Sequence, residues 1–227
     1  MNIFQSIKRL KWYETTLWGV SVLAVLLSYF LFTERNTYTV IAALIGVTAL
    51  IFVAKGDVTG QVLTVIFSIF YGIVSLRFHY YGEMATYLGM TAPIAAGAVI
   101  TWIKNPYKNG EVRIQHTSPK IWTILSTTAI IVTAIFYFIL KKLNTPNIVP
   151  STVSVTTSFM ASSLTLLRSP YYVLFYAAND IILIILWSLA SIEKLYYITM
   201  VICFVCFLIN DLYGFINWQK MKHRQTD

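Results

Sequence analysis

Two Asn-Asp pairs stand inside long apolar stretches and are the residues best placed to do chemistry. Asn179-Asp180 lies near the middle of one stretch, and Asn210-Asp211 lies in the next. A carboxyl group at mid-membrane costs about 2.5–3.5 kcal/mol on insertion scales, so it persists only when paired, hydrated or protonated. The pairs indicate either a polar cavity for a hydroxyl-rich solute or hydrogen bonds that join helices. We expect solute binding at the first pair, and packing or an inner gate at the second.

Aromatic side chains precede the first pair on the same predicted helix. The spacing places Tyr172, Tyr176 and Asn179 on one helical face, with Phe175 nearly in line. Rings beside an amide suit a flat heterocycle, which stacks on the rings while the amide reads its polar edge. Ordinary helix packing also produces aromatic stripes, and the spacing alone does not separate the two interpretations.

Other groups that carry chemistry are few. No histidine lies within an apolar stretch, and Cys203-x-x-Cys206 has no histidine or acid to complete a metal or redox site. The stretches contain no nucleophile–base pair, and no GxxxxGK[ST] sequence is present. We therefore expect no enzyme, no metal, no cofactor and no ATP hydrolysis by this chain. Gln61 and Lys55 are candidates for solute contact at an inner mouth, although Lys55 is more simply explained as a topology anchor.

The elements that must position these residues are membrane-spanning helices. Of the 227 residues 57% are hydrophobic and 11% are charged, whereas soluble domains have about 25% charged residues. This composition excludes a soluble enzyme, a disordered chain and a secreted disulfide scaffold. Helices satisfy their backbone hydrogen bonds internally in lipid, so we predict an all-α polytopic protein. The eight expected spans are 17–32, 38–54, 58–78, 84–103, 121–140, 150–167, 171–190 and 195–218.

The basic residues predict the orientation of these spans. With the N-terminus inside, twelve Lys and Arg fall on the cytoplasmic side and five on the other. Cytoplasmic loops carry such an excess, so we predict a multi-pass cell-membrane protein with both termini cytoplasmic. The net charge of +8 is thereby explained without nucleic acid, and the partners expected are the lipid bilayer and a small solute.

The two halves of the chain show signs of a repeat. A shift of 116 residues places Trp102 on Trp218 and Tyr71 on Trp187. Four spans separate the matched elements, so the repeats are parallel, as in transporters with a site between their halves. The predicted units are an N-terminal segment with an extra helix, a first three-helix bundle, a basic loop with a linker helix, a second three-helix bundle and a basic tail: 1–37, 38–103, 104–143, 144–219 and 220–227. We interpret loop 104–120 as the hinge between the halves.

Short motifs in a fixed order carry a resemblance to a known family. They are Ala54-Lys55-Gly56, Tyr81-Gly82-Glu83-Met84, Arg168-Ser169-Pro170, Asn179-Asp180 and the segment from Asn210 to Trp218. Over about residues 38–220 the chain resembles the nicotinamide riboside transporters, the Pnu-type family related to the SWEET sugar transporters. This resemblance implies two three-helix bundles joined by a linker helix, and facilitated diffusion of a vitamin precursor. A cytosolic kinase would trap the solute by phosphorylation without being a subunit.

The resemblance also implies where the solute binds. The family has a W-x-x-W-x-x-x-N/D pattern, in which Tyr172 and Phe175 occupy the tryptophan positions and Asn179 fits. Tyr71 is retained, whereas Gln61 departs from the family's pattern. The predicted substrate-binding residues are therefore Tyr172, Phe175, Tyr176, Asn179, Asp180, Tyr71 and Gln61. The predicted gate or packing residues are Asn210, Asp211, Arg168 and Lys55.

Several alternatives stay open from the sequence. Nicotinamide riboside is the first expected solute, and a carrier for a deoxynucleoside, thiamine or riboflavin is the alternative within the same family. A proton-coupled carrier that uses Asp180 or Asp211 is a second alternative. A structural subunit of a larger complex is a third, and assembly of several copies of this chain is left open.

Overall fold

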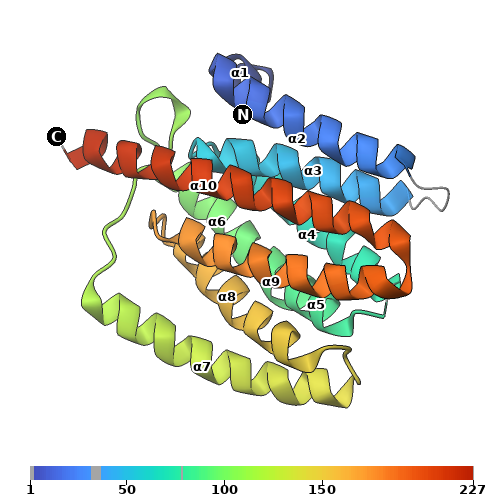
Figure 1. Ribbon diagram of the computed structural model, residues 1–227. Coiled ribbons are helices and arrows are strands. Elements are labelled where there is room, and N and C mark those ends of the chain that lie inside the picture. The colour runs from blue at the N-terminus through green and yellow to red at the C-terminus, as the bar shows by residue number, and fades with distance from the viewer. Residues whose placement is uncertain (1–2, 32–36, 78, 227) are drawn as a thin grey trace.

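A computed structural model of the chain describes residues 3–31, 37–77 and 79–226. Within these ranges the regular structure is helical, apart from a single bridge between Pro106 and Val112. Long helices run side by side and alternate in direction (Figure 1). The helices are α1 (Ile3–Lys8), α2 (Trp12–Leu31), α3 (Thr37–Ala54), α4 (Val58–Arg77), α5 (Tyr81–Thr86), α6 (Ala92–Lys104), α7 (Pro119–Lys142), α8 (Ile148–Leu166), α9 (Tyr172–Glu193) and α10 (Ile198–Thr226).

Among the described residues, seven helical segments are long and apolar enough to cross a membrane. One of them joins α5 and α6 through a π-helical turn, η1 (Tyr87–Thr91), into a single segment Tyr81–Lys104. The eighth long helix, α8, has 19 residues but is rich in Ser and Thr. Because α8 packs against α7 and α9, we count it as the eighth crossing, in agreement with the predicted number.

The helices group as two sets of three. α3, α4 and α5–α6 pack together, as do α8, α9 and α10, and the two sets meet where α3 contacts α10 and where α6 contacts α8. α7 lies at one edge against α8, and α2 lies at the opposite edge against α3 and α10 (Figure 1). This arrangement is the one expected for two three-helix bundles, a linker helix and an extra helix.

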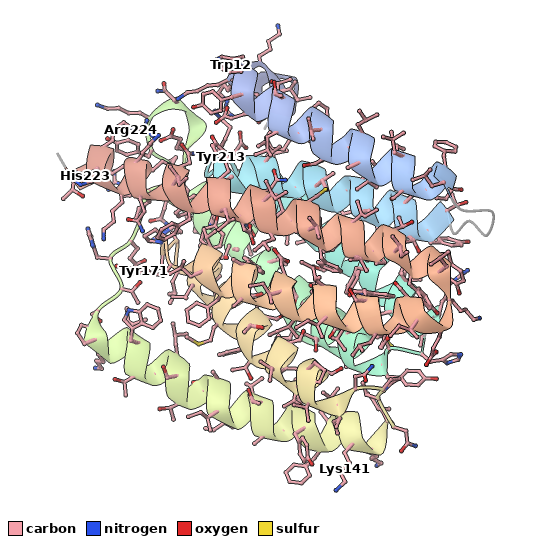
Figure 2. All side chains as sticks on the ribbon, in the orientation of Figure 1. Trp12, Lys141, Tyr171, Tyr213, His223 and Arg224 are labelled. Carbon is pink, nitrogen blue, oxygen red and sulfur yellow. The ribbon has the colours of Figure 1, made fainter. Side chains whose placement is uncertain are left out.

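Both termini of the described chain lie at the same end of the bundle (Figure 1), which we call the terminal end. Lys141 lies at the other end, which we call the far end, well away from Trp12 and Arg224 (Figure 2). The tight turns at the terminal end each contain a left-handed residue, Gly56 with a φ of 67° and Arg168 with a φ of 57°.

The structure adds two details to the predicted units. The predicted tail 220–227 is helical as far as Thr226, because α10 continues past Trp218. The loop interpreted as a hinge is bonded to both sets of helices: Val112 N–H donates to the Gly56 carbonyl at 2.9 Å, and Gln115 N–H donates to the Arg168 carbonyl at 3.1 Å. Arg224 also pairs with Glu111 at 2.5 Å, so α10 fixes the loop.

Candidate functional site

A small cavity lies between the two sets of helices. It is built by α3, α4, η1, α9 and α10, so both sets contribute to its wall. Its lining has aromatic rings, hydroxyls, two amides and two acids, and no Lys, Arg or His among the described residues. The lining residues are Gly46, Ala49, Leu50, Val53, Gln61, Thr64, Phe67, Ser68, Tyr87, Thr91, Tyr176, Asn179, Asp180, Phe207 and Asp211.

Asn179 is held in one orientation by hydroxyls of α8. Its Oδ1 accepts from Thr157 Oγ1 at 2.9 Å and from Ser158 Oγ at 3.1 Å. The Tyr87 hydroxyl is a further hydrogen-bond partner of this amide, across the cavity wall on η1. Because the carbonyl oxygen is already occupied, the amide offers N–H donors to the cavity.

Asp180 of α9 and Asp211 of α10 form a carboxyl pair in the wall. Both are at least 96% buried, and both line the cavity. Two carboxyl groups in one buried wall do not readily ionise together, because burial and mutual repulsion disfavour the doubly charged state. In the part of the chain that the structure describes, neither acid forms an ion pair with Lys or Arg. A carboxylate at either position therefore has no protein cation beside it among the described residues.

Four aromatic rings shape the cavity: Phe67, Tyr87, Tyr176 and Phe207. Phe67 and Phe207 have ring centroids 5.3 Å apart, and Phe67 meets Tyr87 edge to face at 5.9 Å. Gly46 opens the wall here, because a Cβ at this position would collide with the Phe207 ring. These rings present aromatic faces to a flat solute, and such faces also attract cations.

Tyr71 packs against the lining residues Phe67 and Tyr87 but does not itself line the cavity. The side chain is completely buried, and its hydroxyl accepts from Trp187 Nε1 at 2.9 Å. Its ring lies 4.3 Å from Tyr87 and 5.6 Å from Phe204. In this conformation Tyr71 lies in an aromatic cluster between the halves, and its predicted contact with solute stays a prediction.

Tyr172 and Phe175, predicted to share the solute-facing surface, are also placed elsewhere. Tyr172 lies at the start of α9, where its ring packs 4.9 Å from Trp218 and its hydroxyl donates to the Val53 carbonyl at 3.4 Å. Phe175 turns toward Trp122 of α7, at 6.2 Å. Phe175 lies about 100° from Tyr176 but only about 40° from Asn179 around the helix axis, so helical spacing alone does not account for its position outside the cavity.

Gln61 lines the cavity, together with residues of α4 that the sequence analysis did not single out. Thr64, Phe67 and Ser68 follow Gln61 at helical spacing and face the same space. A polar stripe at positions 61, 64 and 68 is the signal that identifies this face. Tyr87, in the π-helical turn, has no comparable signal.

The residues predicted to form a gate or to pack helices make contacts of different kinds. Lys55 pairs with Glu14 of α2 at 2.7 Å, and Tyr213 donates to the other oxygen of Glu14. Asn210 donates to Ser21 at 3.0 Å and to the Cys206 carbonyl at 2.8 Å, which makes it a packing residue. Asp211, by contrast, is part of the cavity rather than a separate gate. Glu14, buried at the start of the first span, was not foreseen.

Arg168 lies at the terminal end, in the turn before α9. Its Nη2 donates to the Gln115 side chain at 2.7 Å. Burial, and then the nearby Arg113, lower the pKa of Arg168. This residue positions the loop and does not reach the cavity. The described residues also contain no cluster of metal-ligating side chains.

Comparison with known proteins identifies the family. A family model described as "Nicotinamide mononucleotide transporter" matches residues 36–220, which is most of the chain. The chain belongs to this family. It is therefore a multi-pass membrane transporter of a small molecule and not an enzyme.

Two curated relatives and one solved structure are similar along nearly the whole length. The nicotinamide riboside transporter PnuC of Neisseria mucosa is 24% identical over 215 residues, covering 92% of this chain and 82% of the relative. The protein of the same name from Haemophilus influenzae is 24% identical over 195 residues, covering 85% and 83%. A crystal structure titled as the vitamin B3 transporter PnuC has a TM-score of 0.84 at 22% identity and covers 97% of both chains. The shared fold confirms the all-helical prediction.

Proposed function

We propose that this transporter takes up nicotinamide riboside by facilitated diffusion. The observation that carries the proposal is the charge of the cavity: it contains the Asp180–Asp211 pair and no basic residue among those that line it. Nicotinamide riboside has a pyridinium ring with a fixed positive charge. A carboxylate in a low-dielectric wall favours such a ring strongly over a neutral one.

The same charge argues against a phosphorylated solute. The family description mentions the mononucleotide, whereas the relatives are named for the riboside. A phosphate needs Arg, Lys or a set of backbone N–H donors, and the lining supplies no basic side chain. Riboflavin and deoxynucleosides lack the positive charge, while thiamine shares it and is the alternative that the cavity favours next.

The remaining contacts follow from the geometry. The Asn179 amide donates a hydrogen bond to the carboxamide oxygen or the ribose of the solute. The Gln61 amide forms a hydrogen bond with another polar group of the solute. Tyr176 supplies an aromatic face, and its hydroxyl lies 3.3 Å from Ser162 Oγ. Tyr71 separates the cavity from the far end until the halves rearrange.

The proposal also includes the orientation of the protein in the membrane and the driving force of transport. Both termini face the cytoplasm, so the terminal end is the inner one and the far end the outer one. A cytosolic kinase acts downstream and keeps the solute inside. A proton-coupled carrier is the second candidate, because two buried carboxyl groups that could carry a proton line the cavity.

Uptake into proteoliposomes tests the proposal. Labelled nicotinamide riboside, nicotinamide mononucleotide, thiamine, riboflavin and thymidine are compared, with counterflow measured at equal pH on both sides. We expect counterflow of the riboside and none of the mononucleotide. Transport of the mononucleotide, or of thymidine alone, contradicts the proposed solute. Accumulation of the riboside above equilibrium on an imposed pH gradient, abolished by Asp180→Asn, favours the proton-coupled candidate.

A further inference from the structure

Glu83 is a buried acid that the cavity does not use. It lies near the start of α5, at the far end of the bundle, and its side chain is 1% exposed. The Ser154 hydroxyl of α8 faces it. Nevertheless, neither Glu83 oxygen makes a hydrogen bond of normal geometry with any described residue, and neither does Ser154 Oγ.

Helix packing does not explain why Glu83 is buried without a hydrogen-bond partner. No Lys or Arg in the described ranges forms an ion pair with Glu83. Thr86 on the next turn and Ser75 on the neighbouring α4 also have buried hydroxyls without partners. Groups that join helices in a membrane do so by hydrogen bonds, and these groups make none. An unsatisfied intramembrane acid is costly and marks functional sites in membrane proteins.

The position of Glu83 relative to the cavity suggests its role. Tyr87 follows one turn later on the same face of the segment and lines the cavity. Tyr87 interacts electrostatically with both Glu83 and Asp180. Asp211 and Asp180 therefore lie at the cavity, and Glu83 lies farther toward the far end. Tyr87 is between Asp180 and Glu83.

The surroundings of Glu83 belong to both halves. α5 is part of the first set of helices, and α8 is part of the second. A Cβ at Gly82 would lie 3.0 Å from Thr145 and 3.7 Å from Ser151, so the start of α5 is packed tightly onto the second set. A movement that parts the halves at the far end would expose Glu83 and Ser154.

We propose that Glu83, with Ser154, forms a second binding station for the positive charge of the solute, occupied when the path opens at the far end. This inference rests on the proposed transport of a cationic solute. Glu83 is absent from the cavity lining, so it acts in a conformation other than the one in which Asp180 and Asp211 hold the charge.

Paired measurements of binding and transport test the station. Nicotinamide riboside affinity is measured by calorimetry on purified protein, and counterflow is measured in proteoliposomes at equal pH. Glu83→Gln keeps the shape of the side chain and removes the charge. We expect counterflow to fall by about tenfold to a hundredfold, the size of a lost charge-assisted contact. The Kd at the distant cavity should change by less than about twofold.

Three further variants complete the experiment. Glu193→Gln, at an exposed acid at the end of α9, is the matched control and should behave as wild type. Glu83→Asp should recover part of the counterflow, and Ser154→Ala should lower it less than Glu83→Gln does. All variants are compared at equal amounts of folded protein.

The outcomes separate the two proposals. If wild-type protein neither binds nor moves nicotinamide riboside, the proposed function fails. If wild type transports it and Glu83→Gln counterflows normally, Glu83 is not a solute station and this inference alone is overturned. If Glu83→Gln and Glu83→Asp both lose counterflow and both have a lowered melting temperature, Glu83 has a structural role. That result also overturns the proposed station.

Discussion

Trp102 and Trp218 contact each other at the terminal end, with ring centroids 5.6 Å apart, and each donates its indole N–H to a helix of the other half. Trp102 Nε1 donates to the Thr165 carbonyl on α8 at 3.0 Å, and Trp218 Nε1 donates to the Val53 carbonyl on α3 at 2.9 Å. A shift of 116 residues in the sequence relates these tryptophans, and their reciprocal bonds support the proposed repeat. The halves are thus joined here by equivalent contacts.

Loss of either indole donor should weaken this junction. Trp102→Phe and Trp218→Phe each leave a buried carbonyl with fewer partners, at a cost of about 1–3 kcal/mol. We expect similar decreases in melting temperature for the two variants. Thermal unfolding of purified protein measures the effect. Unequal effects, with one variant unchanged, would argue against equivalent roles.

Asn179→Ala should weaken solute binding rather than folding. A lost amide partner costs about 1–3 kcal/mol, which is about tenfold to a hundredfold in Kd. Asn210→Ala is the matched control, because Asn210 is a buried amide that bonds to Ser21 and not to the cavity. We expect the control to lower the melting temperature with an unchanged Kd. Calorimetric Kd and melting temperature, measured on the same preparations, distinguish a binding role from a structural role. An unchanged Kd for Asn179→Ala would show that this residue does not bind the solute.

The acid pair should respond non-additively to neutralisation. Because Asp180 and Asp211 lie in the same cavity wall, an amide at either position leaves one carboxyl group that can carry the negative charge. We expect each single Asn variant to bind nicotinamide riboside within a few-fold of wild type. The double variant should lose about tenfold to a hundredfold in affinity. Additive losses in calorimetric Kd would mean that the two acids act independently.

Gly60 should not tolerate a methyl group. A Cβ at this position would approach Val53 Cγ2 to 2.7 Å and the Phe52 carbonyl carbon to 2.8 Å, so α3 and α4 would have to move apart. We expect Gly60→Ala to destabilise the protein by about 1–3 kcal/mol, as overpacking does. Gly19→Ala is the control, because nothing lies within 4 Å of that Cβ, and its melting temperature should not fall.

Cysteine labelling should establish the orientation. Both native cysteines, Cys203 and Cys206, are buried, so their background reaction is low. Lys141→Cys lies at the far end (Figure 2) and should react with an impermeant thiol reagent added outside intact cells. Lys108→Cys, exposed in the loop at the terminal end, should react only after the membrane is permeabilised. The reverse pattern would invert the proposed topology.

The sequence predicted the helices better than the site. The spans were found because long apolar runs have one stable solution in lipid, while their ends shifted: α2 begins at Trp12 rather than 17, and α10 runs to Thr226. Gln61, Tyr176, Asn179 and Asp180 do meet at one cavity. The failures came from contacts between distant segments, which local spacing does not encode.

Two residues illustrate this limit. Tyr71 was expected to contact solute, but Trp187, 116 positions later, holds its hydroxyl. Glu14 was not foreseen, because its partners Lys55 and Tyr213 come from opposite halves of the chain. In both cases the deciding partner becomes visible only when the halves are packed together.

The hydroxyl-rich α8 has a consequence for how the protein is made. Nine of its 19 residues are Ser or Thr, and it is the one long helix of the described chain that falls outside the seven apolar spans. A segment of this polarity gains little when it partitions from the translocon into lipid by itself. During biogenesis α8 therefore has to enter the bilayer as a hairpin with α7 or α9, whose side chains shield its hydroxyls. Correct insertion of the C-terminal half then depends on neighbours that emerge from the ribosome before and after it.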